Sequence, residues 1–89
     1  MPRVIFGPAL QRHVQSPPLE VGGRTLREAL EAAFAVNARI RGYILDDQAH
    51  LRKHMNIFID GLMIADRKGF SEAVSPSSQI YIVQALSGG

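Results

Sequence analysis

The chain ends on "QALSGG", with Gly88 and Gly89 as its last two residues. Glycine has no Cβ, so it contributes no side-chain packing, but it lets another backbone approach closely and reaches backbone angles closed to other residues. The only reactive group at such an end is the terminal carboxylate. Because a carboxylate is a poor electrophile, a chemical role for this end requires that the carboxylate first be activated. The alternative is ordinary fraying at a chain end.

Two other pairs of potentially reactive side chains give weaker evidence of a function. His50 and His54 have the four-residue spacing of two metal ligands on one helix face, but His54 leads into a predicted strand and no third ligand is close in sequence. Asp46-Asp47 is typical of a turn, because a domain of this size offers no evident cleft that would shift the pKa values of a catalytic carboxylate pair. We therefore predict no catalytic residue, no metal site and no bound cofactor.

Composition narrows the class of protein. The 89 residues suffice for one small domain with a modest core. The absence of cysteine excludes disulfides, thiolate metal sites, iron–sulfur clusters and a side chain that carries sulfur. The net charge is only +2, from basic residues scattered between Arg3 and Lys68, so no nucleic-acid partner is expected. No apolar run reaches the roughly 18 residues of a membrane span, so we expect no membrane partner and a cytoplasmic location.

The clearest predicted element is a helix that begins after Thr25 and ends near Asn37. Thr25 is a favourable N-cap, and Glu28 three residues later completes a capping box. Apolar residues then recur at three- and four-residue spacing, as on one face of a helix: Leu26, Ala29, Leu30, Ala33 and Phe34.

Most other segments are expected to be strands. Asp60-Gly61 is a strong two-residue hairpin turn between the strand that starts at Met55 and a second one over 62–64. The remaining expectations are a short strand over 3–6, an irregular edge strand or wide hairpin return over 11–21, a small strand over 43–45, one possible helical turn over 70–74, and a final strand over 79–85. This order predicts an α+β fold, with one main helix packed across one face of a sheet.

Three blocks of sequence, "GRTLREAL", "NIFIDG" and "AVSPSSQIYIVQALSGG", carry a resemblance to a known family. At their spacing, with Gly-Gly last, the chain resembles the MoaD/ThiS-like sulfur carriers, which have the ubiquitin-like β-grasp fold. The resemblance implies a β-grasp domain over 1–84, with a mixed sheet of four to five strands, and a flexible C-terminal tail over 85–89. The chain differs from the family pattern at 75–78 and at Gln84-Ala85. We expect these differences to determine which partner enzyme the surface fits.

The resemblance also implies a function. An adenylating enzyme of the ubiquitin-activating type would use ATP to form an acyl-adenylate on Gly89. Sulfur from a sulfurtransferase or a sulfide source would then convert that end to a thiocarboxylate, for a biosynthetic enzyme that makes molybdopterin, thiamine, cysteine or a similar product. Leu86, Ser87 and Gly88 would thread into the partner, since the extended tail reaches about 17 Å. The protein would be a carrier and a substrate, and not an enzyme.

The expected docking patch consists of Phe58, Tyr81 and Val83. Alternation along the two strands places these three side chains on the sheet face that points away from the helix. An exposed apolar cluster of this kind is typical of a protein-binding surface. The alternative is that a loop or the second strand covers it.

Two other classes of function remain open. In the first, the activated terminus is joined to lysines of other proteins, as in a ubiquitin-like modifier. In the second, the chain is a plain β-grasp binding module, for RNA or protein, with an idle tail. A β-grasp ferredoxin is excluded because the chain has no cysteine.

Overall fold

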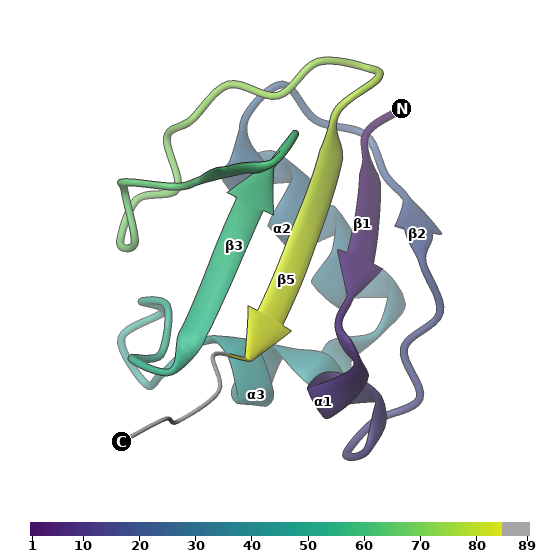
Figure 1. The fold of residues 1–89 in the computed structure, drawn as a ribbon, viewed down its shortest axis with the longest axis vertical. Coiled ribbons are helices and arrows are strands. Elements are labelled where there is room, and N and C mark those ends of the chain that lie inside the picture. The colour runs from purple at the N-terminus through teal and green to yellow at the C-terminus, as the bar shows by residue number, and fades with distance from the viewer. Residues whose placement is uncertain (85–89) are drawn as a thin grey trace.

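The structure is a computed structural model that describes residues 1–84. These residues form a mixed five-stranded sheet in the order β2-β1-β5-β3-β4, and the main helix α2 crosses behind it (Figure 1). The α+β fold with one main helix on one face of the sheet is as predicted. The elements are β1 Arg3–Phe6, α1 Pro8–Gln11, β2 Leu19–Glu20, α2 Leu26–Val36, the 3-10 helix η1 Ala38–Ile40, α3 Arg41–Ile44, β3 Met55–Ile59, β4 Leu62–Met63 and β5 Gln79–Gln84.

Strand β5 occupies the middle of the sheet. It runs parallel to β1, with Arg3 opposite Gln79 and Phe6 opposite Ile82. On its other side it runs antiparallel to β3, with Met55 opposite Gln84. The last described strand is therefore paired along both edges, and the chain leaves it at the end of the sheet near α1 and α3 (Figure 1).

Helix α2 begins as its sequence predicts. The Thr25 hydroxyl accepts a hydrogen bond from the Glu28 backbone N–H at 3.3 Å, and the Glu28 carboxylate accepts one from the Arg24 N–H at 2.8 Å. Two backbone donors of the first turn region are thereby satisfied. The helix ends at Val36, and Asn37 follows as its C-cap.

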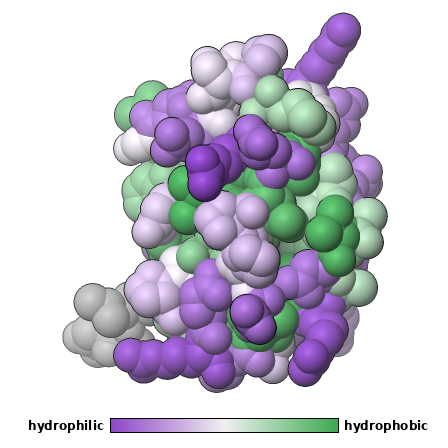
Figure 2. Space-filling view, turned by 90° about the vertical axis from the view of Figure 1, so that its right-hand side faces the viewer, coloured by the Kyte–Doolittle hydropathy of each residue, from purple (hydrophilic) through white to green (hydrophobic). Residues whose placement is uncertain are grey.

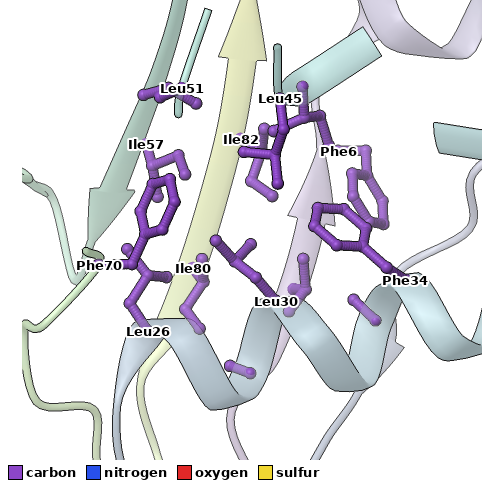
Figure 3. Close-up of a cluster of buried hydrophobic side chains, with 14 of the residues drawn as sticks. Phe6, Leu26, Leu30, Phe34, Leu45, Leu51, Ile57, Phe70, Ile80 and Ile82 are labelled. Carbon is purple, nitrogen blue, oxygen red and sulfur yellow. The ribbon is translucent and has the colours of Figure 1, made fainter. Parts of the chain in front are cut away.

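The core lies between α2 and the sheet. Leu26, Leu30 and Phe34 point from the helix toward the strands, where Ile57, Ile80 and Ile82 are fully buried (Figure 3). Ile57 and Ile82 lie directly opposite each other on β3 and β5. The alternation read from the sequence therefore assigns the buried face correctly for both strands.

The hairpin between β3 and β4 also has the predicted turn. Asp60 and Gly61 have φ angles of 51° and 86°, and Ile59 pairs with Leu62 across them. Two consecutive residues with positive φ match the right-handed twist of the flanking strands, which is why Asp-Gly is favoured there.

Two local predictions are wrong, and one is confirmed in part. The segment 11–21 is an irregular edge as predicted, because its two-residue strand β2 pairs antiparallel with β1 at the edge of the sheet. The short helix α1 before it, which Gly7 caps and Pro8 begins, was not predicted. Residues 43–45 are not a strand: Tyr43 and Ile44 belong to α3, and Leu45 makes a single bridge to Leu51. A turn of helix over 70–74 does not form either, because Phe70 has a positive φ and Ala73 bridges to Thr25.

The edge of the molecule beyond β1 and β2 is mixed in character. Figure 2 shows hydrophobic residues on this side that hydrophilic residues interrupt. A short, polar-flanked edge strand does not favour pairing with another chain.

Over the described residues, no helix has both the length and the apolar content needed to cross a membrane.

The loop between β4 and β5 is organised by Asp66. Its carboxylate accepts hydrogen bonds from the backbone N–H groups of Lys68, Gly69 and Ser71, and from the Ser71 hydroxyl at 2.6 Å. These donors, with the Ser71 hydroxyl as the largest contribution, hold the pKa of Asp66 well below its ordinary value of 3.8.

We expect this carboxylate to make the fold acid-labile. A group whose pKa is lower in the folded state stabilises that state above its unfolded pKa, and the contribution is lost as the pH falls through the folded pKa. Urea midpoints should therefore show Asp66→Asn to be less stable than wild type near neutral pH, with the gap closing below about pH 4. A gap that is constant with pH would contradict this role.

Candidate functional site

A row of apolar side chains crosses the sheet face opposite α2. Met63 on β4 lies opposite Phe58 on β3, Phe58 lies opposite Tyr81 on β5, and Tyr81 lies opposite Ile5 on β1. Directly opposed residues of neighbouring strands project from the same face. The Met63 and Tyr81 side chains are 56% and 41% exposed, whereas Phe58 and Ile5 are half-buried.

The docking patch predicted from the sequence lies on this face. Phe58, Tyr81 and Val83 all line one shallow hollow of about 630 Å³. Tyr81 is exposed, and the other two side chains are half-buried. No helix covers this face, which is turned toward the viewer in Figure 1. The structure thus brings the three residues together, while their role in docking stays a prediction.

The hollow is apolar at one end and polar at the other. At the polar end, the Asp60 carboxylate accepts a hydrogen bond from the Gln79 N–H at 2.9 Å, and the Asp60 N–H donates to the Gln79 carbonyl at 2.9 Å. Ser77 also lines this end. A partner that docks here would meet an aromatic and aliphatic surface bordered by backbone-anchored polar groups.

The apolar end lies beside the point where the chain leaves the sheet. Gly7 on the neighbouring segment donates its N–H to the Ile82 carbonyl at 2.8 Å. A Cβ at Gly7 would stand 3.0 Å from Cγ1 of Val83, closer than ordinary van der Waals contact. Glycine at this position therefore lets the backbone after β1 lie directly against the end of β5.

Arg67 supports the same end of the sheet from the β3 side. Its guanidinium donates to the carbonyls of Arg52 and Met55 at 2.7 and 2.8 Å, and to the Asn56 side-chain oxygen at 3.2 Å. Because Met55 pairs with Gln84, this arginine anchors the strand beside which β5 ends.

The predicted activation and threading residues lie outside the described residues: Leu86, Ser87, Gly88 and Gly89. The rest of the predicted tail over 85–89 also lies outside them.

The histidines and the acidic pair occupy ordinary positions. His13 stacks on Tyr43, with ring centroids 5.1 Å apart. The Asp46 carboxylate accepts hydrogen bonds from the Gln48 and His50 N–H groups, which is turn chemistry; these bonds, chiefly the one from His50, lower the pKa of Asp46. Within 1–84, no three His, Asp or Glu side chains are grouped so that they would hold a metal.

Sequence reasoning missed two members of the apolar row, Ile5 and Met63. Ile5 is far in sequence from Phe58 and Tyr81, whereas Met63 follows Phe58 by only five residues; both join the row through strand pairing. The available signal was the hairpin itself: with a two-residue turn at Asp60-Gly61, Met63 must lie opposite Phe58. The patch is therefore wider than predicted, and it spans β1, β5, β3 and β4.

Comparison with known proteins gives the fold. No protein-family model matches the chain, and no curated protein matches it significantly. Among solved structures, a chain of the Amycolatopsis orientalis BexX/CysO complex matches with a TM-score of 0.82 and 19% identity, covering 100% of both chains. CysO from Mycobacterium tuberculosis matches with a TM-score of 0.81 and 18% identity, covering 97% of this chain and 100% of that one.

A third match is SAMP1 from Haloferax volcanii, with a TM-score of 0.79 and 21% identity over 99% of this chain and 98% of that one. Another structure of the Haloferax protein calls it small archaeal modifier protein 1. These matches, together with the strand order, confirm the ubiquitin-like β-grasp fold that the sequence resemblance predicts.

Proposed function

We propose that this protein is a sulfur carrier that is activated at the carboxylate of Gly89. The observation that carries the proposal is the position of β5: the strand that leads to Gly-Gly is central, and its outer face bears Tyr81 and Val83. A partner that grips the apolar row is thereby placed next to the start of the tail. The motifs shared with the MoaD/ThiS-like carriers and the common fold support the same reading.

The chemistry requires two steps on the partner enzyme. First, the Gly89 carboxylate attacks the α-phosphorus of ATP, pyrophosphate leaves, and an acyl-adenylate forms. Second, hydrosulfide attacks the carbonyl carbon and AMP leaves, which yields the thiocarboxylate without any change of oxidation state. If a sulfurtransferase supplies a persulfide instead, a thiol must then reduce the resulting acyl disulfide.

In this scheme the chain binds no cofactor and catalyses no step. ATP is consumed by an adenylating enzyme of the ubiquitin-activating type, and a biosynthetic enzyme accepts the sulfur. The protein acts in the cytoplasm, where both partners would be found. Its own contribution is to present a docking surface and a narrow, side-chain-poor end that fits a site closed to water.

A second candidate function is that of a protein modifier, favoured by the likeness to small archaeal modifier protein 1. The same acyl-adenylate would then be attacked by a lysine amine, with AMP leaving and an isopeptide bond forming.

Intact-mass analysis after incubation with ATP, sulfide and the host's adenylating enzyme tests the carrier function. Replacement of one oxygen by sulfur is expected for a carrier, whereas Gly89–lysine adducts in cell extracts would identify a modifier. If neither the thiocarboxylate nor the lysine adduct is found, both proposals are contradicted.

We expect Tyr81→Ala to weaken binding to the adenylating enzyme about 30-fold, the equivalent of the ~2 kcal/mol that a central aromatic contact contributes to an interface. Titration calorimetry measures this effect. Tyr43→Ala is a matched control, since Tyr43 is also a tyrosine, is 42% exposed against 41% for Tyr81, and lies on α3 away from the sheet face. An equal loss of affinity in the two variants would contradict docking on the apolar row.

A further inference from the structure

A second hollow, of about 560 Å³, lies on the helix side of the molecule, away from the apolar row. Its floor is apolar and firmly packed: Leu30 and Phe34 come from α2, Leu45 follows α3, and Phe70 comes from the loop before β5. All four side chains are buried in the core. Figure 3 shows Phe34 and Phe70 on either side of Leu30. Such a floor offers an apolar surface that does not need to rearrange.

The rim of this hollow is basic. Arg27, Arg41 and Lys68 line it with a single acid, Glu31, so the formal charge of the lining is three positive minus one negative, or +2. Arg27 pairs with Glu31 at 3.4 Å, and this is the one ion pair formed among residues 1–84. Arg41 and Lys68 are exposed, and neither forms an ion pair within residues 1–84, so both are accessible to an incoming anion.

The backbone of the hollow is unusual as well. Ala49 and Phe70 have φ angles of 62° and 53°, and both line the hollow. An alanine and a bulky aromatic residue seldom adopt such angles, and residues held in this way concentrate at ligand-binding sites.

The fold holds Phe70 in this conformation from both sides. Asp66 accepts the N–H groups of Gly69 and Ser71, and the Arg27 N–H donates to the Phe70 carbonyl at 3.0 Å. The aromatic wall is thus fixed before any ligand arrives, which lowers the entropy lost on binding.

We propose that this hollow binds a small amphipathic anion, with its apolar body over Leu30, Phe34 and Phe70 and its carboxylate, phosphate or sulfonate head between Arg41 and Lys68. The volume falls in the range of about 300–1,000 Å³ that is typical of small-molecule sites, and a few polar groups converge on an apolar floor. The proposal does not depend on the sulfur-carrier function, since it involves neither the apolar row nor Gly89.

Decanoate is a suitable probe, because it combines a carboxylate head with an apolar chain. Titration of the full-length protein, followed by methyl and aromatic carbon–proton correlation spectra, should shift the signals of Leu30, Leu45, Phe34 and Phe70 in a saturable way. Acetate has the charge without the chain, and 1-decanol has the chain without the charge. Each is expected to bind at least about tenfold more weakly, because only one of the two interactions remains.

Two variants make the test specific. Arg41→Glu with Lys68→Glu should weaken decanoate binding about tenfold or more. The matched control is Arg12→Glu with Lys53→Glu, which makes the same change in net charge at exposed residues outside the hollow and should leave the affinity unchanged. Ala35→Trp fills the hollow from an exposed helix position without changing the charge, and it should also weaken binding.

Several results would overturn the proposal. Equal losses in the charge-reversal pair and in its control would show that only net charge matters. Equal binding of decanol would show that the basic rim contributes nothing, and shifts at Phe58 and Tyr81 would place the ligand on the apolar row. If an acidic peptide with one central leucine shifts the same four residues at lower concentration than decanoate, the site binds a protein segment instead.

Discussion

Deletion of Gly89 is expected to reduce thiocarboxylate formation about 100-fold or more, because the reacting carboxylate is then withdrawn by one residue from the position at which ATP is attacked, and misplacement of about 1 Å already costs that much. One extra residue after Gly89 should have the same effect. Intact-mass analysis with ATP, sulfide and the adenylating enzyme measures the product. The melting temperature should not change, because a glycine has no side chain to pack in the core.

A residue added before Met1 serves as the control, because β1 and β5 are parallel, so the chain enters β1 at one end of these strands and leaves β5 at the other. It should leave the reaction unaffected. Thiocarboxylate formation by the shortened or the extended chain would show that Gly89 is not the attachment point. If the full-length chain is not activated and removal of both glycines leaves partner binding unchanged, the protein is a plain binding module.

Ile82→Ala is expected to destabilise the fold by ~2–5 kcal/mol, since it leaves a cavity where a fully buried side chain was. Ile82 lies between Phe6 on β1 and Ile57 on β3, at the centre of the sheet. Small domains have only about 5–15 kcal/mol of stability in total. The melting temperature should therefore fall by roughly 10 °C or more.

Tyr81→Ala is the matched control for this prediction, since Tyr81 is the adjacent residue on the same strand but points to the open face. Its cost should stay within about 1 kcal/mol, the span of strand propensities. The two variants should thus separate: Ile82→Ala loses stability, and Tyr81→Ala loses partner affinity. A Tyr81→Ala variant as unstable as Ile82→Ala would show that the open face is part of the core.

Where the local sequence and the tertiary structure favour the same conformation, the prediction holds. The cap at Thr25 and the turn at Asp60-Gly61 depend on hydrogen bonds and backbone angles within a few residues, so the residue types alone predict them. The alternation in β3 and β5 likewise depends only on the period of a strand. These features suffice to place α2, the hairpin and the face that bears Tyr81.

Where packing between distant segments determines the local conformation, the prediction from sequence is wrong. Ile40 and Ile44 are both completely buried and four residues apart, but η1 and α3 are too short to show a helical period in the sequence. Tyr43, Ile44 and Leu45 have high strand propensity, and packing overrides it. Phe70 is held at a positive φ by the hydrogen bonds of its neighbours Gly69 and Ser71 to Asp66 and by the bond from the Arg27 N–H to the Phe70 carbonyl. No aromatic residue suggests such a φ by itself.

The candidate site follows the same division. Phe58, Tyr81 and Val83 could be grouped from strand alternation, and the predicted hairpin turn would have added Met63. Ile5 required the register of the parallel pair β1 and β5. The basic hollow on the helix side could not be predicted, because its walls come from α2, α3 and two loops that only the folded chain brings together.

The central position of β5 also has a mechanical consequence. A partner that holds the C-terminal end pulls along the axis of this strand, and β5 is hydrogen-bonded to β1 on one side and to β3 on the other. Such a load shears both ladders at once, so many hydrogen bonds must break together before the strand can move. The domain is therefore built to bear tension on its terminus while remaining folded.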